Sequence, residues 1–192
     1  MLQRLAGITL LNTMLLLPTA RGGEAGDLEA QWKDLASADA ARAYAAIWAF
    51  VRTPDKSIAF FEKHLKPATP PERKSVDQLI DELSHERFAV RNNANAALEK
   101  LGDLAAPMLR EALGRKELTL EARQRTEKLL KNLRGPVTSP ERLRVIRAVE
   151  AVEYIGTPAA RKLLEQLAQG AAEARVTVEA QEALRRLRNT QK

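Results

Sequence analysis

An arginine recurs along this chain, and each time it opens an amphipathic run that ends about a dozen residues later in glycine, proline or a polar break. A helical unit of this kind cannot bury its apolar face alone and has to stack against other units. The pattern therefore predicts an array of helical hairpins, an architecture that presents an extended surface to a partner. The runs cover residues 91–102, 123–135, 144–156 and 175–189, and a fainter copy covers residues 42–54.

The composition indicates a folded helical domain and argues against disorder. Alanine, leucine, glutamate, arginine and lysine dominate, while aromatic residues make up only 4% of the chain. A length of 192 residues suits one domain with a substantial core. The net charge of +6 arises from 31 basic and 25 acidic residues, so it is an imbalance on a mixed-charge surface rather than a polybasic tail. The absence of cysteine excludes disulfides and thiolate metal sites.

Residues 1–25 have the layout of a secretory signal. A positive charge precedes an apolar stretch at residues 5–17, and Pro18 separates that stretch from a small-residue region where cleavage after Gly22 or Ala25 fits the pattern. A membrane span needs about 20 apolar residues, so the stretch is too short for a stable crossing. We expect export to the periplasm or the extracellular space. An uncleaved anchor, or a buried or mis-started segment of a cytoplasmic protein, is the alternative.

Residues 26–192 are predicted to form one all-α domain of antiparallel helical hairpins. Apolar residues recur at helical spacing from about residue 28 to residue 187, and no run alternates with a period of two. Three prolines in residues 66–72 cannot continue a helix and mark an internal subdivision. Gly102 is expected to end a helix with a positive φ. Helix starts are indicated by Asp39 and Asp103 as caps, and by the cap-then-proline pairs Thr53-Pro54, Ser139-Pro140 and Thr157-Pro158.

Two of the predicted helices differ in how much of their surface is apolar. The helix that begins at Pro140 is apolar on two sides, which predicts that it is sandwiched between neighbours. The helix that begins at Pro158 has a narrow apolar stripe and is expected in an outer layer. Six aromatic residues near the front of the chain fit a core stripe and are predicted to be buried rather than to line a pocket: Trp32, Tyr44, Trp48, Phe50, Phe60 and Phe61.

Two segments resemble HEAT-type repeats. Residues 88–113 have the sequence FAVRNNANAALEKLGDLAAPMLREAL, and residues 142–168 have the sequence RLRVIRAVEAVEYIGTPAARKLLEQLA. Residues 28–187 as a whole also resemble the helical domain that follows WD-type propeller repeats in planctomycete proteins. The resemblance implies a HEAT-like antiparallel helical-hairpin array, an α-solenoid, from a bacterium. It also implies that the recurrent arginines tie adjacent units together through hydrogen bonds or a carboxylate: Arg91, Arg123, Arg144 and Arg175.

The two histidines of the chain do not suggest catalysis or metal binding. His64 and His85 are too isolated to ligate a metal together, and both are expected to be exposed at helix ends. Ser84, His85 and Glu86 contain the side chains of a hydrolytic triad, but adjacent residues on a turn point apart. A chance association therefore explains this tripeptide better than a hydrolytic site.

The paired carboxylates are also interpreted as surface features. Asp77 and Asp81, like Glu150 and Glu153, lie at helical neighbour spacing among basic residues, which indicates solvated ion pairs rather than an acid–base pair. The chain also contains no glycine loop of the kind that cradles phosphates. We therefore predict no catalytic residue, no cofactor and no metal site, and a protein that is not an enzyme.

The leading hypothesis for function is a non-enzymatic helical-repeat scaffold, outside the cytoplasm, whose concave face binds a protein partner. A nucleic-acid binder of the HEAT-like DNA-repair glycosylase type is one alternative, suggested by the basic pI near 9.8. A helper enzyme resembling the HEAT-like bilin lyases is the other, although only the fold analogy suggests it. A basic cluster near the C-terminus could meet phosphates or acidic lipid, but a solvated helix face explains it better: Arg185, Arg186, Arg188 and Lys192.

Overall fold

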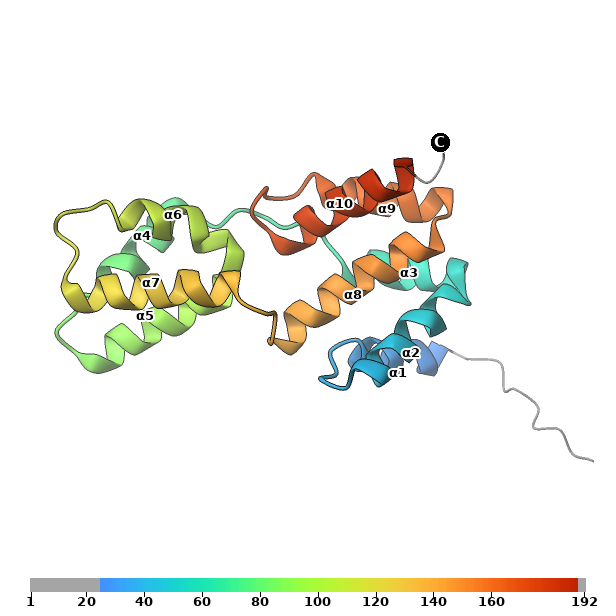
Figure 1. Cartoon of the computed structure of the whole chain (residues 1–192), viewed down its shortest axis with the longest axis horizontal. Coiled ribbons are helices and arrows are strands. Elements are labelled where there is room, and N and C mark those ends of the chain that lie inside the picture. Colours follow the sequence, from blue (N-terminus) through green and yellow to red (C-terminus); the bar gives the residue numbers. More distant parts are fainter. Residues whose placement is uncertain (1–24, 190–192) are drawn as a thin grey trace, which may run out of the picture.

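The computed structural model describes residues 25–189, in which every regular element is a helix and none is a strand. The prediction of an all-α chain is therefore confirmed. Residues 1–24, which contain the apolar stretch behind the prediction of export, lie outside the described residues, as do residues 190–192. The elements are α1 (Ala25–Asp34), α2 (Ala40–Val51), α3 (Pro54–His64), α4 (Arg73–Glu82), α5 (Phe88–Leu101), the 3-10 turn η1 (Gly102–Ala105), α6 (Ala106–Ala112), α7 (Leu120–Arg134), α8 (Pro140–Ile155), α9 (Pro158–Ala168) and α10 (Arg175–Asn189), shown in Figure 1.

Three of the predicted caps bond to the first turn of a helix, whereas Thr53 precedes α3 without a capping hydrogen bond from its side chain. The Asp39 carboxylate accepts hydrogen bonds from two backbone N–H groups of the first turn of α2, and the hydroxyls of Ser139 and Thr157 cap α8 and α9 in the same way. Gly102 follows α5 with a φ of 59°, where a side chain would be strained. Asp103 differs from the prediction. Its side chain caps no helix, because η1 intervenes before α6 and the carboxylate turns toward two arginines instead.

The described helices form two lobes, and the chain passes from the first lobe into the second and back again (Figure 1). Helices α4–α7, residues 73–134, surround their own apolar core and are called the inserted lobe. Helices α1–α3 and α8–α10 surround a second core and are called the discontinuous lobe. Each pair of described helices that packs extensively belongs to a single lobe. Packing order therefore differs from sequence order, since the last three helices pack on the first three.

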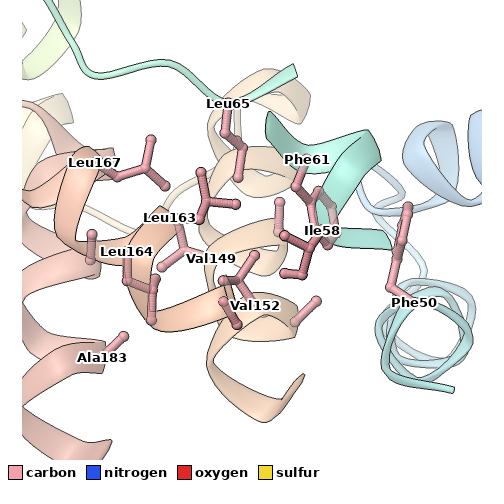
Figure 2. Packing of buried hydrophobic residues seen from close by; sticks show 14 of the residues in the cluster. Phe50, Ile58, Phe61, Leu65, Val149, Val152, Leu163, Leu164, Leu167 and Ala183 are labelled. Atoms are coloured by element: carbon pink, nitrogen blue, oxygen red, sulfur yellow. The ribbon is translucent and has the colours of Figure 1, made fainter. Parts of the chain in front are cut away.

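Helix α8 lies in the middle of the discontinuous lobe. It packs against α1, α2 and α3 as well as α9 and α10, so the prediction of a sandwiched helix is confirmed. Val149 and Val152 of α8 are buried among side chains from α3 and α9 (Figure 2). Helix α9 buries a single stripe, as predicted for an outer layer. The largest fully buried side chains of this lobe are Phe50, Phe61, Leu35, Leu164 and Leu167.

In two helices, the arginine at the fourth position donates hydrogen bonds to the turn that precedes the helix. Arg91 of α5 donates to the carbonyl of His85 at 2.8 Å, and its Nε lies 3.0 Å from Glu121 of α7. Arg123 of α7 donates to the carbonyl of Leu113 at 2.9 Å, just beyond α6. Each guanidinium satisfies a carbonyl that the preceding helix end leaves without an intrahelical partner.

In α8 the arginine that bonds to the end of another helix is Arg147 rather than Arg144. Arg147 donates to the carbonyls of Leu35 and Ser37 at 2.7 and 2.8 Å, and so joins α8 to the end of α1. The Arg144 guanidinium lies 5.5 Å from the Trp32 ring, and its buried Nε has no hydrogen-bond partner among the described residues. The prediction for Arg144 is therefore wrong, because the end of α1 lies beside Arg147, about one turn further along α8.

Two connections join the lobes, residues 65–72 and residues 135–139. The first is non-helical throughout, as its prolines predict. The backbone N–H of Ala171, beyond α9, donates to the carbonyl of Ala68 in this connection at 2.8 Å. The neighbouring Gly170 must be a glycine, because a Cβ there would lie 2.7 Å from the backbone nitrogen of Ala68. The first connection is therefore held against the C-terminal half of the discontinuous lobe.

Candidate interaction surfaces

A cleft of about 1130 Å³ lies between the two lobes. Its apolar lining comes from both sides, with Leu101, Leu104 and Leu133 from the inserted lobe and Val145 and Val176 from the discontinuous lobe. All five side chains are only half-buried. The cleft therefore keeps apolar surface in contact with water, which is the property that marks binding grooves.

Asp103 joins the lobes at this cleft. Its Oδ2 accepts a hydrogen bond from Arg142 of α8 at 2.8 Å and lies 3.6 Å from the Nε of Arg175 of α10. The contact of Arg175 agrees with the predicted tying role, although the arginine also pairs with Glu179 of its own helix at 3.7 Å. These side chains are partly exposed, so each pair contributes about 1 kcal/mol or less. The lobes are positioned by polar contacts that are individually weak.

The charges that line the cleft nearly balance. Four basic side chains, Lys100, Lys131, Arg142 and Arg175, face three acidic ones. A groove that follows a nucleic-acid backbone gathers cations to neutralise several phosphates, and this cleft lacks that excess. The acidic side chains in the lining are Glu99, Asp103 and Glu141.

Among these acidic groups, Glu141 has a shifted pKa. A hydrogen bond from its own backbone N–H, followed by one from the Ser139 hydroxyl, lowers the pKa of Glu141 below its usual value. A general acid at neutral pH needs the opposite shift, because it has to hold a proton. Glu141 is therefore a firmly ionised group at the start of α8, where the helix dipole also favours a negative charge.

The histidines lie at helix ends, as predicted. His64 ends α3, where its ring stacks on Phe60 with centroids 3.9 Å apart and lies 5.2 Å from Trp32. His85 is exposed after α4, and its Nδ1 accepts the backbone N–H of Arg87 at 3.0 Å. Within residues 25–189, no three carboxylate or imidazole side chains gather as a metal ion would require.

One of the two predicted carboxylate pairs, Asp77 and Asp81, forms ion pairs as expected. The other pair, Glu150 and Glu153, differs from the expectation. Asp77 and Asp81 of α4 both lie beside Arg115, at 2.5 and 3.3 Å. Glu153 of α8 accepts two hydrogen bonds from Arg186 at 2.7 and 2.6 Å and is only 12% exposed. The expectation that Glu153 is solvated is therefore wrong, because α10 packs over this part of α8.

A second exposed surface, here called the aromatic patch, consists of Tyr44 and Trp48 of α2 and Tyr154 of α8. Their exposed fractions are 58%, 38% and 49%. The Trp48 and Tyr154 rings stack with centroids 5.5 Å apart and planes 8° from parallel, and Tyr44 meets Trp48 edge-on at 6.1 Å. The prediction that Tyr44 and Trp48 belong to the core is wrong, whereas Phe50 and Phe61 are buried and Trp32 and Phe60 pack against the core.

The spacing within α2 explains this difference. Tyr44 and Trp48 are four residues apart and therefore share one face of the helix, while Ala43, Ile47 and Phe50 occupy the opposite, buried face. Grouping all the aromatic residues into one stripe overlooked this division. Tyr154 was not singled out from the sequence, because its position beside Trp48 depends on the packing of α8 against α2.

We expect the phenol of Tyr154 to ionise at a higher pH than an ordinary tyrosine phenol. The hydrogen bond to Glu150, at 3.1 Å, and then the charge of that carboxylate raise the pKa of Tyr154. The chain contains two tyrosines, so the difference between the ultraviolet pH titrations of the parent and of Tyr154→Phe isolates Tyr154. Glu150→Gln should return the pKa toward its usual value. An unchanged midpoint in that variant would contradict the contact.

Comparisons with protein-family models, with curated proteins and with solved structures give no match for this chain. Between residues 25 and 189, no helix combines the length and apolar character that crossing a membrane requires.

Proposed function

We propose that this protein is a non-enzymatic interaction module that binds a segment of a partner protein in the cleft between its two lobes. The observation that carries the proposal is the cleft itself, where half-buried leucine and valine side chains of both lobes are surrounded by charged groups of both signs. Apolar surface at the centre of a binding site with polar groups around it is typical of protein–protein interfaces.

The size of the cleft favours a protein segment over a small molecule. Pockets for small ligands usually have volumes of about 300–1,000 Å³ and enclose most of the ligand. The volume of about 1130 Å³ lies above that range. The near balance of charges also favours a peptide with mixed side chains over the uniformly anionic backbone of a nucleic acid.

We also propose that the protein acts outside the cytoplasm and that its hairpins are HEAT-type units. The signal-like layout of residues 1–25 supports the first statement. The second rests on Arg91 and Arg123, which occupy the same position in successive hairpins and make the same contact with a preceding turn. Intact mass of the protein from its native host tests export, since cleavage should remove about 22 to 25 residues.

The binding proposal is tested with Leu104→Arg, which places a long cation in the cleft. Leu104 is partly exposed and lies in η1, outside both buried cores, so the substitution should leave the fold intact. We expect cross-linked partner recovered from the host envelope to fall at least about tenfold, because a charge displaces an apolar contact at the centre of the interface.

Leu120→Arg is the matched control. It makes the same change at the first residue of α7, where Leu120 is 72% exposed and does not line the cleft. Recovery of the partner should not change in this variant. Equal effects of the two substitutions would exclude the cleft as the binding site. Lesion- or sequence-selective binding of duplex DNA that survives physiological salt, with no protein recovered, would favour the nucleic-acid alternative.

A further inference from the structure

Helix α2 leaves an apolar face uncovered. Of its residues Ala40–Val51, only Arg42 is charged. A helix that is apolar all round is normally buried on all sides. Ala43, Ala46, Ile47 and Phe50 are indeed buried, but the opposite face is exposed and carries Ala41, Tyr44, Ala45 and Trp48.

Helix α8 extends this face with Tyr154 and runs along α2 in the same direction. Arg147 of α8 bonds to Ser37 before the start of α2, while Tyr154, two turns later in α8, stacks on Trp48 in the second half of α2. Glu150 precedes Tyr154 by one turn of α8, just as Tyr44 precedes Trp48 by one turn of α2. Because the two helices run in the same direction, Glu150 and Tyr44 lie on the same side of Trp48. The aromatic patch continues without a break from one helix to the other.

Two charges of opposite sign flank the patch. Arg52 follows α2, one turn beyond Trp48 and on the same helical face, and Glu150 precedes Tyr154 by one turn of α8. Neither residue has an ion-pair partner in the part of the chain that the structure describes, and Glu150 accepts only the hydrogen bond of Tyr154 there. The patch thus has a cation at one end and an anion at the other.

We propose that this surface binds a second copy of the same chain around a two-fold axis close to Trp48. A two-fold rotation there reverses the direction of α2, so that Arg52 of each copy faces Glu150 of the other and the aromatic rings meet in the centre. A partner with a single charge sign would satisfy only one end of the patch, whereas a second copy of the chain supplies both signs.

The side chains of α2 also suit this contact. Ala41 and Ala45 are small, so the two helices can approach closely between the aromatic rings. Exposed tryptophan and tyrosine side chains are the residues that most often dominate interface energy. Two-fold dimers are the commonest assemblies of identical chains, because one self-complementary surface closes the complex.

The test is the dissociation constant of the whole chain, measured by sedimentation velocity across a concentration series. We expect a reversible monomer–dimer equilibrium. Trp48→Ala should weaken it at least about tenfold, because the central ring is removed. Unchanged far-ultraviolet circular dichroism should accompany this variant, since Trp48 belongs to neither buried core.

Charge exchange tests the orientation. Arg52→Glu and Glu150→Arg should each weaken the dimer, because each places like charges opposite one another, and the double variant should restore the constant to within about threefold of the parent. Lys162→Glu, on the exposed side of α9, is the matched control and should have no effect. A monomer throughout the series, self-association that Trp48→Ala leaves unchanged, or a double variant no better than either single one would overturn the proposal.

Discussion

Replacing Val149 by aspartate is expected to unfold the discontinuous lobe while the inserted lobe stays folded. The Val149 side chain is 1% exposed in the middle of α8, between helices from the two ends of the chain. An unpaired carboxylate there loses the apolar contacts and its hydration, which costs about 4 kcal/mol or more of the free energy of unfolding.

Hydrogen exchange measured by mass spectrometry checks this result segment by segment. Protection should be lost in α2 and α3 as well as in α8–α10, although α3 and α8 are separated by the whole inserted lobe in sequence. Ala159→Asp introduces the same side chain at an exposed position of α9, and Lys162→Ala removes an exposed charge, so both should change stability by less than about 0.5 kcal/mol. Loss of protection confined to α8–α10 would contradict the shared core.

The second large effect is expected from Ile80→Asp, which should unfold the inserted lobe and spare the discontinuous lobe. Ile80 of α4 is fully buried in the core of the inserted lobe, so the carboxylate has no compensating partner. Exchange should become fast across α4–α7 and remain slow in α8 and α9. The reason is that the lobes share few contacts beyond the Asp103 ion pairs, the exposed ion pair of Arg110 with Glu173 at 3.8 Å, and the two connections.

Ala89→Asp is the matched control for this variant, because it places an aspartate on the exposed side of α5 within the same lobe. Its free energy of unfolding should stay close to that of the parent. If Ile80→Asp removes protection from both lobes together, the two cores form one cooperative unit and the division into lobes has no energetic meaning.

The secondary structure followed from local sequence because the forces that set it act over a few residues. Asp39, Ser139 and Thr157 cap helices through side chains that reach backbone groups two or three residues away, and the prolines of residues 66–72 prevent a helix wherever they occur. The two apolar sides of α8 likewise showed that this helix would be covered twice.

An apolar stripe shows that a face will be buried, but not which helix will bury it. The stripes of α2 and α8 would fit many partners, and only the closing of a core from both ends of the chain brings these two helices together. The same long-range packing places Arg147, rather than Arg144, beside the end of α1. It also brings Asp103 into contact with the other lobe, where the local sequence predicted a cap. Trp48 and Tyr154 stack on each other at the surface for the same reason. Local sequence therefore determined the helices of this protein, while the tertiary structure decided its two cores, its cleft and its exposed aromatic patch, because these depend on contacts between residues far apart in the chain.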